Sequence, residues 1–289
     1  MKPPAFRYHD PREVTEAIGL LAKCENAKLL AGGQSLMPML NMRYVLPDHV
    51  IDLNRIGALS YIREEKGALE IGAMTRQRDI EFSGVVSGSC PLMAEAIRQV
   101  GHRQTRNRGT IGGSLCHLDP SAELVSVAAA QDATVRVAGP KGTREIAFAD
   151  FPAGYMTPAI APDELVTSVG FPAWPKGHGY AFMEFARRRG DFAIVSAAAL
   201  MTLDANGKVA RVSLTIGGAS SASLRMRKAE ESLLGEKAGE GVFRAAAESC
   251  RDIDAVGDVH APASYRRQLA AVLARRALLL AHSRIGGRP

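Results

Sequence analysis

The sequence predicts a mixed α/β protein built from two or three lobes, and three observations support this prediction. Helix-like and strand-like apolar segments alternate between residues 11 and 137, which is typical of α/β folds. A cluster of proline and glycine residues at 172–179 then interrupts the pattern and marks a boundary. Beyond it, two apolar runs joined by Asn206-Gly207 predict an antiparallel hairpin.

The first quarter of the chain is expected to contain two helices and three strands. Residues 11–24 carry apolar side chains at helical spacing, with Pro11 after a capping Asp10 as the expected start. The other expected elements are a short helix at 37–42 and strands at 28–31, 49–53 and 69–74.

The central part is expected to be mainly helical, with helices at 75–82 and 91–100 and a loop at 101–109. Asp119 to Glu123 read as a helix start, because an acidic cap, an early proline and a further carboxylate follow one another. The elements expected after this start are a helix to residue 130, strands at 134–137, 194–204 and 208–217, and helices at 226–234, 241–251 and 264–282, the last capped by Ser264.

Composition excludes several classes of protein. A net charge of +6 over 289 residues, with 6% aromatics not interleaved with the basic runs, argues against a nucleic-acid-binding protein. No apolar run is long enough to span a bilayer, and residues 1–7 lack the apolar core of a secretory signal, so a cytoplasmic protein is expected. The four cysteines lack Cys-x-x-Cys spacing, so no metal site is expected and packing is favoured over a redox role for Cys116.

Two glycine-dense turns are the most informative feature. The first glycine turn is Ala31-Gly32-Gly33-Gln34-Ser35-Leu36, and the second is Thr110-Ile111-Gly112-Gly113-Ser114. Adjacent glycines let backbone N–H groups approach an anion, so two such turns suit a dinucleotide with two phosphates. The alternative for the first turn is a plain strand-to-helix bend. Neither the G-x-G-x-x-G pattern nor a G-x-x-x-x-G-K-[ST] loop is present, which disfavours a nicotinamide Rossmann site and a nucleoside triphosphatase.

Glu123 lies ten residues after Gly113, at the expected start of a helix. A carboxylate there suits the hydroxyl groups of a ribose or ribityl chain, and a simple charge at a helix N-terminus is the alternative. His102 and His117 flank the second turn and are expected to be structural rather than acid–base residues.

These motifs, with Phe185-Ala186-Arg187-Arg188-Arg189-Gly190-Asp191-Phe192-Ala193, resemble the FAD-binding medium subunit of molybdenum hydroxylases, of the xanthine dehydrogenase and carbon-monoxide-dehydrogenase type. The likeness covers nearly the whole chain. It implies a two-lobed FAD-binding part, with lobes at 1–55 and 56–175, and a C-terminal flavoprotein domain at 176–289 that combines an antiparallel sheet with helices.

The resemblance also implies the cofactor-binding residues. They are Leu29, Leu30, Ala31, Gly32, Gly33, Gln34, Ser35, Leu36, Thr110, Ile111, Gly112, Gly113, Ser114, Asp119, Glu123, Leu165, Val166, Asp191 and Phe192. Leu165 and Val166 match a strand that borders the isoalloxazine ring, and Phe192 an aromatic that covers one ring face, with ordinary core packing as its alternative. One departure is that Met183 and Glu184 stand where several relatives have a lysine.

The implied function is electron transfer within a heterohexamer. A large molybdenum–pterin subunit would perform the substrate chemistry, and a small subunit with two [2Fe–2S] clusters would pass electrons to FAD and on to an external acceptor. This chain would then hold no catalytic residue of its own. Two alternatives are a self-contained FAD-dependent oxidoreductase acting on a small molecule, and a non-redox assembly subunit that binds no nucleotide.

Overall fold

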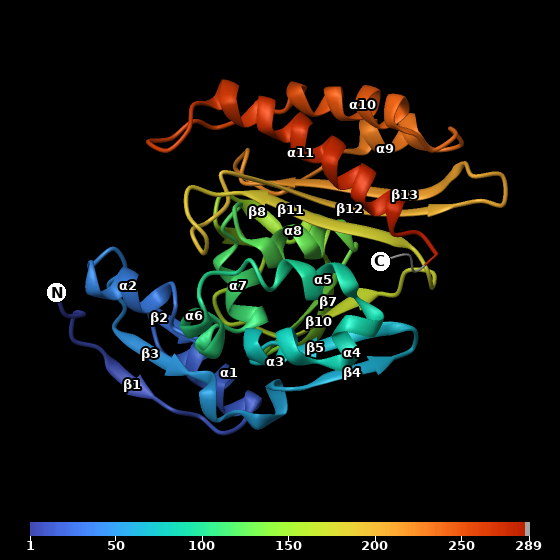
Figure 1. Ribbon diagram of the computed structural model, residues 1–289. Helices are drawn as coiled ribbons and strands as arrows, with labels where there is room; N and C mark the ends of the chain where they lie inside the picture. The colour runs from blue at the N-terminus through green and yellow to red at the C-terminus, as the bar shows by residue number, and fades with distance from the viewer. Residues whose placement is uncertain (287–289) are drawn as a thin grey trace.

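The computed structural model describes residues 1–286, whose strands form three main sheets and one two-stranded ribbon. The sheets follow one another along the chain and define an N-terminal lobe, a central lobe and a C-terminal domain (Figure 1). This is the mixed α/β architecture that the sequence predicts. No helix among the described residues combines the length and the apolar character needed to cross a membrane.

The N-terminal lobe holds a small parallel sheet in the order β1-β3-β2. Its elements are β1 (Arg7–His9), α1 (Val14–Lys23), β2 (Ala27–Leu30), α2 (Leu36–Asn41) and β3 (His49–Asp52), followed by the short helices η1 (Leu53–Arg55) and η2 (Gly57–Leu59). Ala17 of α1 and Ile51 of β3 are both fully buried and belong to one apolar cluster, so α1 covers the sheet. Burial of such side chains is the main source of stability in a lobe of this size.

The central lobe holds a five-stranded antiparallel sheet in the order β4-β5-β10-β6-β7. Its strands are β4 (Ile62–Glu65), β5 (Ala68–Gly72), β6 (Thr134–Gly139), β7 (Gly142–Ala147) and β10 (Leu165–Pro172), and the ribbon is β8 (Pro152–Gly154) with β9 (Thr157–Pro158). Its helices are α3 (Gln77–Phe82), α4 (Gly84–Ser89), α5 (Pro91–Ala96), α6 (Arg103–Arg108), α7 (Ile111–His117), α8 (Glu123–Ala130) and η3 (Phe148–Asp150).

The C-terminal domain is a four-stranded antiparallel sheet in the order β11-β12-β13-β14, between helices on both faces (Figure 1). Its elements are β11 (Gly179–Phe185), β12 (Val195–Leu203), β13 (Val209–Gly217), β14 (Leu224–Arg225), α9 (Arg227–Leu233), α10 (Glu240–Glu248), η4 (Ser249–Asp252) and α11 (Ala263–Ser283).

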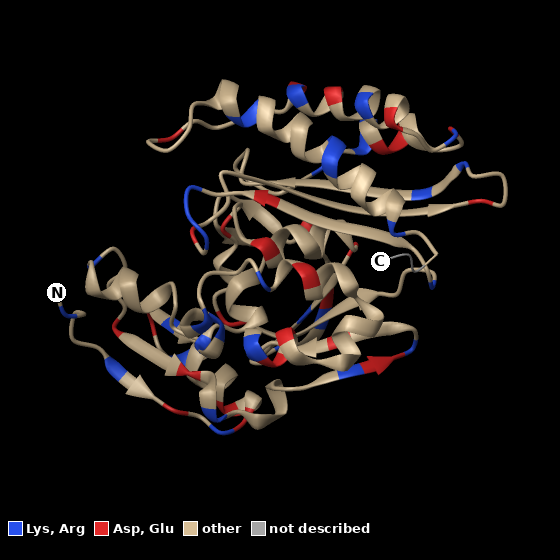
Figure 2. Cartoon of the chain, in the orientation of Figure 1, with Lys and Arg blue, Asp and Glu red and all other residues tan. Residues whose placement is uncertain are grey.

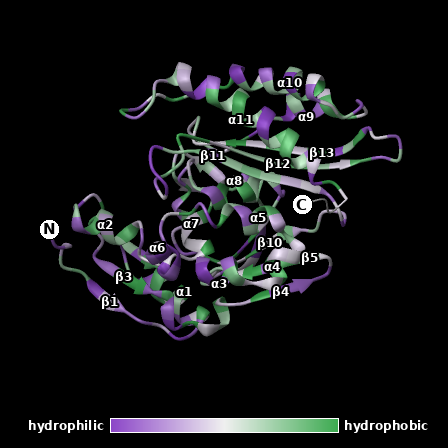
Figure 3. Ribbon diagram, in the orientation of Figure 1, coloured by the Kyte–Doolittle hydropathy of each residue, from purple (hydrophilic) through white to green (hydrophobic). Residues whose placement is uncertain are grey.

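Strand β12 is apolar on both faces because both faces are covered. Ala198 and Leu200 belong to the core of the central lobe, whereas Ala197, Ala199 and Met201 belong to the core under α11. In Figure 3 the outer helices α10 and α11 carry hydrophilic and hydrophobic colouring together, as expected for helices with one face on the sheet and one in solvent.

Glu95 of α5 joins the central lobe to the C-terminal domain. Its carboxylate accepts a hydrogen bond from the Phe182 N–H (3.1 Å) and one from Arg284, just after α11 (2.5 Å). Arg284 also donates to the Tyr180 carbonyl (2.9 Å). Two segments distant in sequence are thus fixed to one helix by charge-assisted hydrogen bonds.

Several details of the expected elements are wrong, among them the following three. The expected loop at 101–109 contains α6, which Arg106 stabilises by an ion pair with Glu81 (2.9 Å) and a hydrogen bond to the Val100 carbonyl. The first helix begins at Val14 rather than at Pro11, and no side-chain cap is formed there. Ser264 does not cap α11, which has Pro262 at that position.

Candidate functional site

The two glycine turns lie against each other. A Cβ placed on Gly113 would stand 3.5 Å from the Ala31 Cβ, at ordinary contact distance. A Cβ placed on Gly32 would lie 2.4 Å from the Arg108 carbonyl oxygen, so only glycine allows this approach. The turns are 79 positions apart in sequence, and the fold brings them into contact.

The first glycine turn presents free backbone donors. Gly33 has a φ of +74°, in the left-handed region, and Ser35 that follows is right-handed, with φ −103° and ψ −48°. Within residues 1–286, the N–H groups of residues 33–36 donate to no other backbone or side-chain group. Successive N–H groups around such a change of hand form an anion-binding concavity.

The second glycine turn is built differently, because it is the N-terminus of α7 and the N–H groups of residues 111–114 already donate within the protein. Thr110 caps the helix and accepts from the Gly113 N–H (3.1 Å), while the Gly112 N–H donates to the Ala73 carbonyl (2.9 Å). A Cβ on Gly112 would stand 2.7 Å from the Ala73 Cβ and carbonyl oxygen. Close packing on the central sheet therefore explains this glycine. The expectation that both turns offer free N–H groups to an anion is wrong for residues 111–114 of the second turn.

Asn54 and Arg76 connect the first turn to the end of α6, just before the second turn, a feature that the sequence analysis missed. Asn54 donates to the Ala31 carbonyl (3.0 Å), and Arg76 donates both to Asn54 and to the Arg108 carbonyl. Burial, followed by the neighbouring Arg108, lowers the pKa of Arg76. Arg76 therefore places positive charge next to Asn54, the residue that holds the first turn at the Ala31 carbonyl.

Glu123 is a buried carboxyl at the start of α8, with 3% of its surface exposed. Burial above all, together with the nearby carboxylates of Glu184 and Asp119, raises its pKa to about 8. Burial also raises the pKa of Glu184 on β11 to about 7, and one Glu184 oxygen has no partner within residues 1–286. A protonated carboxyl is a hydrogen-bond donor as well as an acceptor, which suits sugar hydroxyl groups.

The other predicted site residues divide into core and surface. Leu165 is fully buried in the core of the N-terminal lobe, and Val166 is buried in that of the central lobe, so both side chains serve packing. Asp119 is not the cap of α8 that the sequence predicts, because Ala122 occupies that position; its carboxylate accepts from the Ser121 N–H (2.8 Å) in the turn before the helix. Leu29 and Leu30 on β2 are half-buried beside the N-terminal core.

Asp191 and Phe192 lie on the loop 186–192 after β11, a basic segment in Figure 2. Phe192 is 55% exposed, which excludes ordinary core packing, and Asp191 pairs with Arg188 (3.1 Å). Gly190 has a φ of +87°, and a Cβ there would stand 2.4 Å from the His102 ring. This contact holds the loop against the segment that leads into α6 and the second turn.

Cys116 on α7 does not have the character of a redox residue. Burial raises the pKa of its thiol to about 12, so the unreactive thiol form prevails at neutral pH.

Adjacent turns with a free N–H concavity, flanking guanidinium groups and a buried carboxyl define a protein that binds an anionic nucleotide. Comparison with known proteins identifies the family. Residues 4–174 match the FAD binding domain in molybdopterin dehydrogenase, and residues 180–281 match the CO dehydrogenase flavoprotein C-terminal domain. The chain therefore belongs to the FAD-binding medium subunits of molybdenum hydroxylases.

Relatives of known activity match over nearly their whole length. The 6-hydroxypseudooxynicotine dehydrogenase complex subunit alpha of Paenarthrobacter nicotinovorans is 40% identical, over 96% of this chain and 95% of that protein. The carbon monoxide dehydrogenase medium chain of Hydrogenophaga pseudoflava is 35% identical, over 98% and 99%. A solved structure of carbon monoxide dehydrogenase from Hydrogenophaga pseudoflava superposes with a TM-score of 0.96 at 36% identity, covering 99% of this chain and all of that one. The protein is a subunit of an oxidoreductase and its cofactor is FAD.

Proposed function

We propose that this chain is the exit point for electrons in a three-component complex. Through its FAD it accepts electrons from [2Fe–2S] clusters of a small partner subunit and delivers them to an external acceptor. A large partner subunit with a molybdenum–pterin centre performs the substrate chemistry. The names of the relatives support this assignment, since they include a carbon monoxide dehydrogenase medium chain, a nicotine 6-hydroxylase medium subunit and a xanthine dehydrogenase FAD-binding subunit.

The observation that carries the proposal is the free N–H concavity of the first glycine turn, closed on one side by the second turn. Gly33 to Leu36 bind the FAD diphosphate through backbone donors, and Arg76 and Arg108 add positive charge. Gly113 and Ser114 border the adjoining part of the cofactor. The other predicted contacts to this region are Leu29, Leu30, Ala31, Gly32, Thr110, Ile111 and Gly112.

The residues near the reactive end of the cofactor bind and orient it. Glu123 donates or accepts a hydrogen bond at a ribose or ribityl hydroxyl, as its neutral form allows. Phe192 covers one face of the ring, and Asp191 holds its loop through Arg188. FAD supplies the redox chemistry, because it exchanges electrons both singly and in pairs. Met183 and Glu184 provide no positive charge, so Arg187 on the following loop is the nearest candidate for that effect.

The test is a reconstituted complex in which only this chain is varied. With the wild-type chain, substrate should reduce an external acceptor. With Gly33→Val, which removes the left-handed turn, substrate should still bleach the iron–sulfur clusters while acceptor reduction falls in proportion to lost FAD. Gly33→Ala, with a smaller side chain, should show an intermediate loss.

The self-contained oxidoreductase makes the opposite forecast. If the isolated chain oxidised a small substrate at a rate comparable to the complex, electron transfer from a partner would not be its function. If the purified chain bound no FAD at all, as in the assembly-subunit alternative, the assignment of the first turn would also fail.

A further inference from the structure

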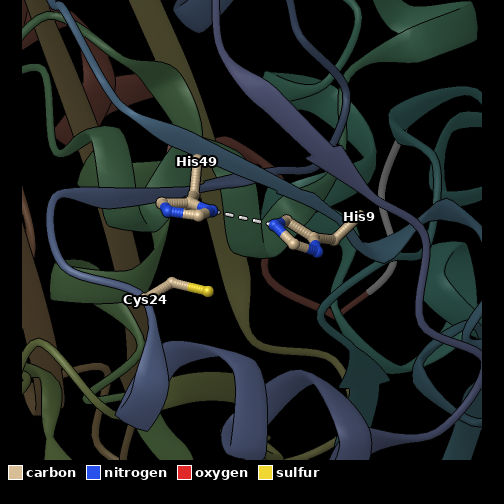
Figure 4. A group of neighbouring side chains, drawn as sticks. All are labelled: His9, Cys24 and His49. Carbon is tan, nitrogen blue, oxygen red and sulfur yellow. Dashed lines mark hydrogen bonds between the residues drawn. The ribbon is translucent and has the colours of Figure 1, made fainter.

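Three metal-ligating side chains meet on the N-terminal lobe, away from the glycine turns (Figure 4). His9 is the last residue of β1, His49 the first residue of β3, and Cys24 the residue that ends α1. The His9 Nε2 lies 2.9 Å from the His49 Nδ1, and the Cys24 sulfur and one ring nitrogen of each histidine all lie within 4.8 Å of one another. All three side chains are half-buried.

The local fold produces this meeting. Strands β1 and β3 are parallel with Arg7 opposite His49 and His9 opposite Ile51, so both histidines stand on the sheet face that carries Ile51. Helix α1 covers that face. Its chain leaves the helix at Cys24 in an extended conformation, with φ −96° and ψ 109°, which brings the thiol to the histidines.

The geometry matches a borderline-soft cation. Zinc binds imidazole nitrogen at about 2.0–2.1 Å and thiolate sulfur at about 2.3 Å in a tetrahedron. Two such nitrogens stand about 3.3 Å apart and a nitrogen and sulfur about 3.6 Å apart. The observed nitrogens need to separate by a few tenths of an ångström, and the sulfur, which lies within 4.8 Å of the histidine ligand atoms, needs to approach them by at most about 1.2 Å. Nitrogen and thiolate donors favour zinc over magnesium or calcium.

A hydrogen bond between the two imidazoles is the simpler reading of the 2.9 Å distance, but it leaves the thiol unexplained. Within residues 1–286 the Cys24 sulfur has no hydrogen-bond partner, although it lies beside both rings. The carboxylates next to the histidines in sequence are engaged elsewhere, Asp10 with Arg55 (2.7 Å) and Asp48 with Asn26 (2.9 Å). The set is therefore two imidazoles and one thiolate.

We propose that His9, Cys24 and His49 bind one zinc ion, with water as the fourth ligand. This site is independent of FAD binding. The second ring nitrogen of each histidine has no protein acceptor within the described part of the chain, and such outer contacts strengthen metal sites. The ion is therefore exchangeable. It crosslinks the edge strand β1, the strand β3 and the end of α1, and so stabilises the lobe that carries the first glycine turn.

The test uses the full-length chain after chelator treatment. Competition with a chromophoric chelator should give about one zinc ion per chain, with X-ray absorption at the zinc edge showing one sulfur at about 2.3 Å and nitrogens at about 2.0 Å. Zinc should also raise the thermal unfolding midpoint of the wild type by a few degrees. Cys24→Ser and His49→Gln should each lower zinc affinity at least tenfold, while His260→Gln, an exposed histidine on another domain, should leave it unchanged.

Zinc stoichiometry and the zinc-edge spectrum of the wild-type chain test the proposal even if a variant fails to fold. Absence of stoichiometric zinc at micromolar free ion, or a zinc-edge spectrum without sulfur, would overturn the proposal. Equal zinc affinity in the wild type, the Cys24→Ser variant and the His49→Gln variant would overturn it as well. FAD absorbance recorded on the same samples reports separately on the cofactor site.

Discussion

Replacing Glu123 with glutamine should remove much of the fall in stability that the wild type shows as pH rises. The folded state holds the Glu123 proton to about pH 8 because the carboxyl is buried, whereas the unfolded chain releases it near pH 4.5. Between these values the folded state binds more protons, so its stability is fully present below about pH 4.5 and is lost as pH rises through about 8. A pKa raised this far corresponds to a loss on the order of 5 kcal/mol.

Glutamine resembles the protonated carboxyl in shape and does not titrate. The free energy of unfolding, from urea titrations followed by circular dichroism, should therefore be similar for Glu123→Gln and wild type at pH 5. At pH 9 the variant should be several kcal/mol more stable. Glu231→Gln, on the exposed side of α9, is the matched control and should follow the wild type at every pH. Parallel pH dependences for the wild type and the Glu123→Gln variant would refute the reasoning.

Three further predictions concern packing and contacts. Gly112→Ala should lower the free energy of unfolding in urea by about 1–3 kcal/mol, because the added Cβ meets Ala73, the residue after β5. Gly19→Ala is the control and should be neutral or stabilising, because the space around Gly19 is open. Equal effects of the two substitutions would contradict the packing argument. Asn54→Ala should weaken FAD binding about tenfold by calorimetry, since it frees Arg76 and the first turn, and an unchanged affinity would exclude that role. Arg266→Met should lower the free energy of unfolding, measured by thermal unfolding, by about 3 kcal/mol, because the buried carbonyls of Ile194 and Gly218 lose their donor. A smaller effect than that of replacing an exposed arginine would argue against this role.

Local signals in the sequence are sufficient for much of the C-terminal domain. Asn206-Gly207 predicts the hairpin that β12 and β13 form, and Gly207 has the left-handed φ of +74° that such a turn requires. The apolar stripe at 264–282 predicts α11 to within one residue at each end. These elements could be predicted because spacing along a few residues decides them.

The candidate site could be predicted only as far as the residue types of its two turns. Which N–H groups are free depends on Ala73 and Thr75, whose carbonyls accept from the second turn, and nothing in the turn itself reveals them. The hydrogen bond between Arg76 and Asn54 joins residues 22 positions apart. The cluster of His9, Cys24 and His49 joins three separate secondary-structure elements. Spacing rules for metal ligands detect sites whose ligands are close together in sequence, so they cannot detect this cluster.

The contacts of Glu95 depend on a residue that is made late in synthesis. Its partner Arg284 lies 189 residues further along the chain, so α5 keeps an unmatched carboxylate until the last helix has been made and has docked. Before then, the face of α8 that packs on β12 and β13 stays open to solvent. A fragment that stops near residue 174 would expose this apolar face, and we expect it to associate with itself rather than remain dispersed.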